Sequence, residues 1–446
     1  MLNRVAPTAG SNDIDLSAFW MPFTPNQRFK SAPLMIASAE LNHYVLEDGR
    51  KVLDGSAALW CVNAGHQRPR IVEAIRQQSE QLDFVSCFSN GHEPAFRLAS
   101  RLAALAPGNL NHVFFANSGS EAVDTALKIA LAYHHARGEA GRFRFVGRDR
   151  AYHGVGFGGL SVGGLGGNKK QFGPLLPGVV HMPHTHDPDR NGFSKGLPEH
   201  GVELADRLEA IIATCDASTI AAVIVEPVAG AGGLLPPPVG YLKRLREICD
   251  KHGLLLIFDE VITAFGRLGK TFASQALGVV PDMITCAKGL TNAAVPMGAV
   301  IVSDQIHDAI MAATSAGPEL SHGYTYSGHP LACAAALATL DVHEEDGLNE
   351  HALAIAKTLE DDIHALRSRP HVRDIRNIGV LAAVEIESRP GAPGARGVEI
   401  RAQALELGAL VRAAGDLLLL SPPLTFTSGD MSELVSIVGR ALDQVE

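Results

Sequence analysis

Long apolar runs are absent from this sequence. No stretch reaches the ~18 uninterrupted apolar residues that a membrane helix needs. The opening residues, MLNRVAPTAGSNDIDLSAFW, contain no basic stretch followed by an apolar run, which is the pattern of a secretory leader. We therefore expect a cytoplasmic protein without a membrane partner.

Blocks of a single charge are also absent. The net charge of −10 is spread along the chain, and no stripe of lysine and arginine could neutralise a run of phosphates. We therefore expect no nucleic acid among its partners.

Paired cysteines are missing as well. Six cysteines stand singly in 446 residues, without CxxC spacing, so we expect reduced, structural thiols. Cys286 lies inside an apolar run two residues before Lys288. We interpret it as core packing rather than a catalytic thiol, because a buried thiol is usually inert.

The apolar content is sufficient for more than one core. A chain of 446 residues that is 46% hydrophobic exceeds what one core usually supports, which predicts a large domain and a smaller one. Between about residues 110 and 300, short apolar runs alternate with longer amphipathic stretches, as in βαβ units around a mainly parallel sheet. The predicted strands are 112–116, 143–147, 221–225, 254–258, 283–287 and 299–302.

The pattern changes beyond about residue 330. Helices at 330–345 and 351–368, short strands near 372–386 and 417–420, and a closing helix predict an α+β unit. The predicted fold class is therefore α/β, with a mainly parallel sheet in a large domain beside a smaller α+β domain. We expect the large domain at 60–330, the small domain at 331–446, and an N-terminal segment, 1–59, that joins the small domain.

Parallel strands bring the residues that follow them to one edge of the sheet. That edge should collect Ser118, Tyr152, Glu226, Asp259 and Lys288, which come after five of the predicted strands. Three of these positions lie in motifs with a recognisable chemistry.

The first motif is ANSGSEAVDTALKIA, residues 116–130. A strand, an Asn-Ser-Gly-Ser turn and a helix bring unpaired N–H groups, two hydroxyls and a glycine together, which suits a phosphate group. The alternative is an ordinary cap by Ser118 with the acid Glu121 three residues on, and taken alone the motif favours it.

The other two motifs supply a carboxylate and an amine. LLLIFDE, residues 254–260, ends an apolar strand in two acids, of which Asp259 could bind a protonated ring nitrogen while one acid could simply cap a turn. In MITCAKG, residues 283–289, Lys288 is either a surface lysine or an amine whose pKa a pocket lowers for imine formation. Together the three motifs offer a phosphate-binding turn, a carboxylate for a ring nitrogen and an amine for an aldehyde. These match the three reactive groups of pyridoxal 5′-phosphate (PLP).

From about Trp20 to the C-terminus the sequence resembles the fold-type I, class III ω-aminotransferases, most closely those that use β-alanine and pyruvate. LLLIFDEVITAFGRLG (254–269) and PDMITCAKGLTNAAVPMGAV (281–300) resemble the family's cofactor signature. The resemblance implies PLP as cofactor, with Lys288 as its Schiff-base lysine and Asp259 as the partner of the ring nitrogen, both catalytic. It also implies a homodimer or a dimer of dimers, because HGYTYSGHP (322–330) resembles the segment whose threonine, here Thr325, reaches the partner's phosphate.

The same resemblance implies the remaining site residues. The implied cofactor contacts are Ser118, Gly119, Ser120, Tyr152, His153, Glu226, Asp259, Val261, Lys288 and Thr325. The implied substrate contacts are Phe23, Trp60, Phe88, Tyr152 and Arg412. Arg412, in LVRAAGD (410–416), is expected to hold a carboxylate in a bidentate fork, and no metal is expected.

The implied function is transfer of an amino group from an ω-amino acid of the β-alanine type, or from an amine, to pyruvate, with PLP and its amine form alternating in a ping-pong mechanism. The products are alanine and an oxo-acid or aldehyde. Other PLP reactions on the same fold, namely amino-group mutation, racemisation or decarboxylation, are the nearest alternative.

Two further motifs suggest other chemistry. GVGFGG (154–159) fits the GxGxxG pattern of an NAD-dependent oxidoreductase, but it does not lie directly between a strand and a helix. The segment HMPHTHDPD offers metal ligands in His181, His184, His186 and Asp187, although the prolines favour a loop with hydrogen-bonded histidines.

Overall fold

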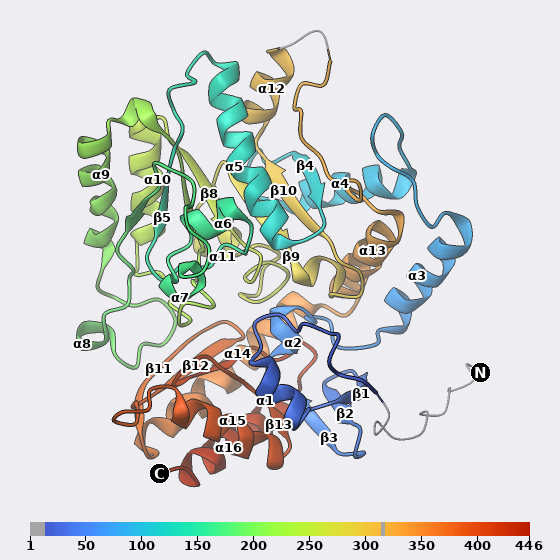
Figure 1. The fold of residues 1–446 in the computed structure, drawn as a ribbon, viewed down its shortest axis with the longest axis vertical. Coiled ribbons are helices and arrows are strands. Elements are labelled where there is room, and N and C mark those ends of the chain that lie inside the picture. Colours follow the sequence, from blue (N-terminus) through green and yellow to red (C-terminus); the bar gives the residue numbers. More distant parts are fainter. Residues whose placement is uncertain (1–13, 314–316) are drawn as a thin grey trace.

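The structure, a computed structural model, describes residues 14–313 and 317–446. The first 13 residues, which form most of the opening stretch considered for a leader, lie outside this part of the chain. Figure 1 shows a large body built around one sheet above a smaller body, to which the beginning of the described chain and its last helix both belong. Among the described helices, none combines the length and apolar character needed to cross a membrane.

The large sheet has seven strands in the order β4-β10-β9-β8-β7-β5-β6. Every neighbouring pair is parallel except the two that involve β10, so the prediction of a mainly parallel sheet is confirmed. The strands are β4 His112–Ala116, β5 Arg144–Arg148, β6 Val180–Met182, β7 Ile220–Val225, β8 Leu255–Asp259, β9 Met283–Ala287 and β10 Gly298–Val302. Only β6, three residues long, was not predicted.

The central strands, β7 to β10, are nearly continuous apolar runs because both faces of the sheet are covered. In β8, Leu256 and Phe258 join one hydrophobic core, whereas Leu255 and Ile257 join another on the opposite face. The helices that pack on the first face include α4 Glu93–Leu105, α9 Arg207–Cys215, α10 Tyr241–His252 and α13 Pro330–Glu345. The second face is covered by α5 Gly119–Ala136 and α12 Asp304–Ala312. Cys286 is buried in the first core, as expected for a packing residue.

The smaller body contains two four-stranded sheets. One has the order β1-β2-β3-β13, so a strand from the end of the chain, β13, pairs in parallel with β3 from its beginning. The other has the order β11-β12-β15-β14. The strands are β1 Ile36–Glu40, β2 His43–Leu46, β3 Lys51–Asp54, β11 Val372–Ile378, β12 Leu381–Ile386, β13 Ala409–Leu410, β14 Arg412–Ala413 and β15 Leu417–Leu420.

Three helices cover these sheets: α14 Leu348–His364, α15 Ala395–Glu406 and α16 Ser428–Asp443. The predicted helices at 330–345 and 351–368 are confirmed as α13 and as α14 with the short turn η5 Ala365–Ser368, while α15 was not predicted. The other helices and turns are α1 Asn26–Ser31, α2 Ala57–Trp60, α3 Pro69–Gln81, α6 Phe157–Val162, α7 Gly166–Lys169, α8 Pro188–Asn191, η2 Val202–Asp206, η3 Ala217–Thr219, α11 Ala273–Leu277 and η4 Lys288–Thr291.

Candidate active site

A cavity of about 390 Å³ lies at the edge of the large sheet where its parallel strands end. Most of the predicted site residues line it: Phe23, Trp60, Gly119, Ser120, Tyr152, His153, Glu226, Asp259, Val261, Lys288 and Arg412. The rule that parallel strands deliver their following residues to one edge explains why positions so far apart in sequence meet here.

The start of α5 forms one wall. Ser118 is the N-cap and its Oγ accepts from the N–H of Glu121 at 3.2 Å, while the Glu121 carboxylate accepts from the N–H of Asn117 at 2.7 Å. The capping interpretation is therefore confirmed for Ser118. Gly119 and Ser120, in the first turn, carry backbone N–H groups that have no carbonyl partner within the helix. They face the cavity and suit an anion.

Gly119 is needed for this close approach. A Cβ at this position would lie 2.9 Å from Cγ1 of Val261, which forms another part of the wall. Any larger residue would force Val261 away from the cavity, so the glycine and the valine define the space together.

The GVGFGG segment packs on α5 instead of forming a dinucleotide turn. It is separated from β5 by residues 149–153, and the N–H of Gly159 donates to Asp124 Oδ1 of α5 at 2.7 Å. A Cβ at Gly156 would lie 2.3 Å from Asp124 Oδ2. The N–H of Val155 donates to Ser120 Oγ at 3.1 Å. The glycines therefore allow close packing beside the phosphate-binding candidate.

Asp259, the last residue of β8, is buried with defined partners. Its Oδ1 accepts from the N–H of Val261 at 3.1 Å and from Thr285 Oγ1 at 3.2 Å, and its Oδ2 lies 2.8 Å from His153 Nδ1. These contacts hold the carboxylate at the cavity wall. His153 is almost fully buried, and its Nε2 has no hydrogen-bond partner among the described residues.

Lys288 follows β9 in a left-handed conformation, with φ 52°. Its Nζ lies 5.4 Å from the ring centroid of Trp60, and no hydrogen bond or ion pair holds it among the described residues. Burial lowers the pKa of the Lys288 ammonium from its ordinary value, and the charge of Arg412 acts in the same direction against the opposing charges of Asp259 and Glu226. A lowered pKa favours the neutral form of this amine.

Glu226, directly after β7, is also buried. Burial raises its pKa, and the charge of Asp259 adds to the increase, although the N–H groups of Gly230 and Tyr152 donate to its two oxygens at 2.8 and 3.0 Å. Burial likewise raises the pKa of the Tyr152 hydroxyl. Glu226 therefore fixes the backbone of Tyr152 at the cavity.

Arg412 approaches from the smaller body. Its guanidinium carbon lies 4.7 Å from the centroid of the Trp60 ring, and its Nε is buried without a hydrogen-bond partner in the described part of the chain. No carboxylate forms an ion pair with it there. A guanidinium group that lines a cavity and has no ion-pair partner is suited to bind the carboxylate of a ligand.

Three predicted residues are not among those that line this cavity. Ser118 lies behind it as the helix cap, and Phe88 and Thr325 are exposed. Phe88 lies beside the segment that carries Thr325, since a Cβ at Gly323 would be 3.0 Å from its ring. A second group lines the cavity without having been predicted: Leu59, Gly154, Leu165, Asn168, Ala231, Ile262 and Ala414. Thr285 was also missed, although a hydroxyl inside the apolar strand MITCA was a visible signal.

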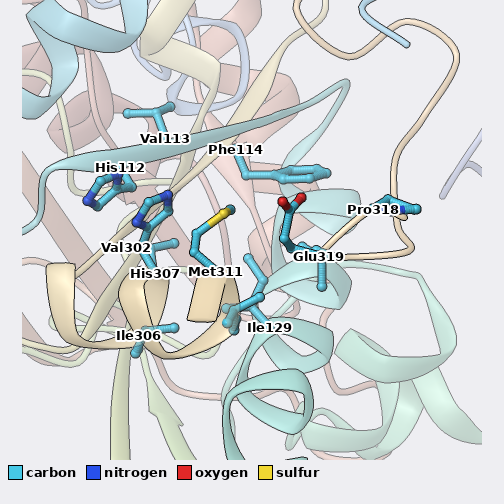
Figure 2. Close-up of a pocket in the computed structure, with 12 residues that line it drawn as sticks. His112, Val113, Phe114, Ile129, Val302, Ile306, His307, Met311, Pro318 and Glu319 are labelled. Carbon is cyan, nitrogen blue, oxygen red and sulfur yellow. The ribbon is translucent and has the colours of Figure 1, made fainter. Parts of the chain in front are cut away.

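A second cavity, of about 380 Å³, lies between β4, β10, α5 and α12, and Figure 2 shows its lining. Its walls are mainly apolar, with the rings of His112 and His307 stacked at 3.5 Å along one side (Figure 2). None of the predicted site residues lies in it. The first cavity is therefore the candidate active site.

The histidines of HMPHTHDPD have separate partners. His181 Nε2 lies 2.8 Å from the carbonyl oxygen of Gly163, and His186 lies 3.5 Å from Glu385, with which Arg376 also pairs. Asp187 pairs with Arg190. Within the described part of the chain, the three histidines of this segment and Asp187 form no common group of possible metal ligands, although His186 lies with Asp374 and Glu385 in one.

Comparison with known proteins agrees with this site. The model of the family "Aminotransferase class-III" matches residues 25–442. The chain belongs to the class-III aminotransferases. It is 56% identical to an omega-aminotransferase of Caulobacter vibrioides, over 99% of this chain and 100% of that protein. It is 46% identical to a beta-alanine–pyruvate aminotransferase of Pseudomonas aeruginosa, over 99% of each chain.

A solved structure gives the same result for this aminotransferase. An amine transaminase from an uncultivated Pseudomonas species, determined in a PLP-bound form, superimposes with a TM-score of 0.89 at 38% identity, over 96% of this chain and 99% of that one. The predicted family and fold class are therefore confirmed.

Proposed function

We propose that this class-III aminotransferase uses PLP to transfer an amino group from an ω-amino acid of the β-alanine type, or from an amine, to pyruvate. One observation carries the proposal: a lysine amine and an arginine, both without an ion-pair partner among the described residues, surround a single cavity with a buried carboxylate and the start of a helix. The similar proteins with omega-amino donors and pyruvate in their names support it.

The residues present fit PLP. The N–H groups of Gly119 and Ser120 suit its phosphate, Asp259 suits its protonated ring nitrogen, and Val261 and Tyr152 flank the space between them. Ser118 contributes through its cap on α5. When bound, PLP supplies an electron sink for the negative charge that develops at the donor carbon.

Lys288 is the group that moves the proton. Burial lowers the pKa of Nζ, which favours the neutral amine that can take the proton from the donor carbon bearing the amino group and return it at the next step. Asp259 keeps the proton on the ring nitrogen, and the contacts from Val261, Thr285 and His153 prevent the carboxylate from turning away.

Arg412 binds the donor's carboxylate. The arginine lies on the Trp60 ring, whose face stabilises a cation, and burial lowers the pKa of its guanidinium. Phe23 and Trp60 form the apolar walls beside it. A simple amine has no carboxylate to offer, so Arg412 must then swing aside or remain unpaired.

The functional unit in this proposal is a homodimer, which can pair further into a dimer of dimers. Thr325 and Phe88 do not line the cavity of their own chain and are exposed, as expected for residues that complete the partner's site. Phe88 is 57% exposed although it is aromatic, which an interface would explain.

Two further proposals concern the whole chain. We infer a cytoplasmic location, which the six free cysteines support because disulfides are rare in reducing compartments. We also infer a division into 1–59, 60–330 and 331–446. The pairing of β13 with β3 and the core shared by Leu53 with α14 and α16 support the assignment of the N-terminal segment to the small domain.

The test is an absorption spectrum of the PLP-loaded protein, recorded before and after β-alanine and then after pyruvate. We expect a band at the edge of the visible range that β-alanine bleaches and pyruvate restores, together with parallel initial-rate lines for a ping-pong mechanism. Turnover without pyruvate would indicate a mutase or racemase, and release of carbon dioxide a decarboxylase. Absence of the band after incubation with PLP would refute the cofactor and the role of Lys288.

A further inference from the structure

The short helix α2 has an unusual backbone. Ala57, Ala58 and Trp60 have φ values of 44°, 62° and 59°, a region that residues with a side chain rarely adopt. Ala58 combines φ 62° with ψ −78°, the rare and strained form of a γ-turn. Strain of this kind persists only where surrounding contacts enforce it, and it gathers at functional sites.

Asp54 supplies the enforcing contacts. This fully buried carboxylate accepts from the N–H of Ala58 at 2.7 Å through Oδ2, and from the N–H of Ser56 at 3.0 Å through Oδ1. His66 Nε2 lies 2.8 Å from the same Oδ2 and holds the carboxylate in place. Both oxygens are therefore engaged on the turn that precedes Trp60.

The strained turn presents its side chains to the active site. Leu59 and Trp60 both line the cavity, and the Trp60 ring lies 4.7 Å from the guanidinium carbon of Arg412 and 5.4 Å from Lys288 Nζ. Trp60 is thus the common neighbour of the two cations that act on the donor in the proposed function.

Asp54 lies on β3, and Arg412 follows β13, the strand that pairs with β3. Asp54 ends β3 opposite Leu410 of β13, and the N–H of Gly55 donates to the Leu410 carbonyl at 2.9 Å. Arg412 follows two residues later. The strand pair fixes the starting points of both the Trp60 turn and Arg412, so the direction of the turn decides how the ring meets the guanidinium.

We propose that Asp54 is a positioning residue for donor selectivity: by holding Ala58 in its strained conformation, it fixes Trp60 against Arg412 and so sets the preference for donors that carry a carboxylate. The kinetic part of this inference rests on the proposed function. The structural part, the position of Trp60, does not.

The experiment uses Trp60 as its own reporter. The chain has only two tryptophans, and the other, Trp20, is 89% exposed, so Trp20→Phe leaves a single signal from a buried ring. In the PLP-loaded enzyme of this background, Asp54→Asn should raise acrylamide quenching of Trp60 at least about threefold, because the ring leaves its buried position. The KM for β-alanine should rise about tenfold and that for propylamine less than about threefold.

Two variants of Ala58 provide independent tests. Glycine adopts positive φ without steric cost, so Asp54→Asn combined with Ala58→Gly should recover both readouts to within about threefold of the parent. Ala58→Val makes the same conformation harder to adopt while Asp54 is intact, and the exposed side chain has room. Ala58→Val should therefore reproduce the effect of Asp54→Asn. If Asp54→Asn does not fold, Ala58→Val alone tests whether the conformation of Ala58 controls Trp60.

Asp282→Asn is the matched control, because Asp282 also accepts from a backbone N–H, that of Leu256 at 2.7 Å, but is not part of the site. It should leave quenching and the KM ratio unchanged. Unchanged Trp60 quenching in both Asp54→Asn and Ala58→Val, or equal losses with both donors, would overturn the proposal. If the parent transfers no amino group from β-alanine, the proposed function fails, while quenching still tests Asp54.

Discussion

Arg412 has no ion-pair partner among the described residues, and burial lowers the pKa of its guanidinium. A donor carboxylate removes this cost, whereas a simple amine does not. In the proposed function, the energetic difference between the two kinds of donor would therefore lie mainly at Arg412.

Arg412→Ala should raise the KM for β-alanine about 100-fold, since removal of one partner of a buried charge pair costs ~2–5 kcal/mol. The KM for propylamine should change less than about threefold, as measured in steady-state assays with saturating pyruvate. Arg401→Ala, an exposed arginine close enough for its charge to affect Arg412, is the control and should leave both values near those of the parent. Equal losses for acids and amines would argue against an anchor.

At the scale of elements, α13 joins the two bodies and contains a buried histidine. The ring of His343 is buried, and its Nε2 has no hydrogen-bond partner in the part of the chain that the structure describes. Burial, together with the charges of Arg267 and Arg68, lowers the pKa of His343 to about 4, against the opposing charge of Asp346. The native state therefore keeps this ring neutral at pH values where the unfolded chain is already protonated. Stability from His343 is complete above pH ~6.5 and is lost as the pH falls toward about 4.

His343→Gln should make the free energy of unfolding less dependent on pH. When the pH falls from 7 to 5, the free energy of unfolding of the parent should decrease by about 2 kcal/mol because of this one group. The reason is that the unfolded state takes up a proton that the native state does not bind. Urea unfolding at the two pH values measures the difference. The exposed His200→Gln should keep the parent's dependence, and an equally steep loss in His343→Gln would contradict the assignment.

At the scale of the whole molecule, the segment with Thr325 is held to α5 of its own chain. His322 Nε2 lies 2.8 Å from Thr125 Oγ1, and its Nδ1 lies 3.1 Å from Lys128 Nζ. Thr325 itself is exposed and does not line the cavity of its own chain. In the proposed homodimer one subunit would thus position a ligand for the other's phosphate site.

Thr325→Ala should weaken PLP binding about tenfold in every subunit of its homodimer, because one hydrogen bond to a charged group is lost. When this variant is reassembled with Lys288→Ala, a quarter of the sites should regain parental PLP affinity and activity, since each mixed dimer contains one intact site. Ser321→Ala, in the same segment, should bind PLP like the parent. A monomer in solution, or no recovery on mixing, would refute the shared site.

All strands of the large sheet except β6 were predictable, chiefly because burial on both faces makes the central ones nearly continuous apolar runs. The residues after them were predictable because parallel strands end at one edge. For the same reason Asp259 and Lys288 could be selected before any geometry was known. These features depend on local sequence and on a general rule of chain direction.

Only the tertiary structure decided the remaining features. The pairing of β3 with β13 joins distant parts of the chain through backbone hydrogen bonds that carry no sequence pattern, and β13 has two residues. The strain at Ala58 and its support by Asp54 arise from contacts that form only in the folded chain. An alanine in the sequence gives no indication that its φ will be positive. The exposure of Phe88 and Thr325 away from their own cavity likewise follows from where the folded chain carries them, which composition and periodicity do not contain.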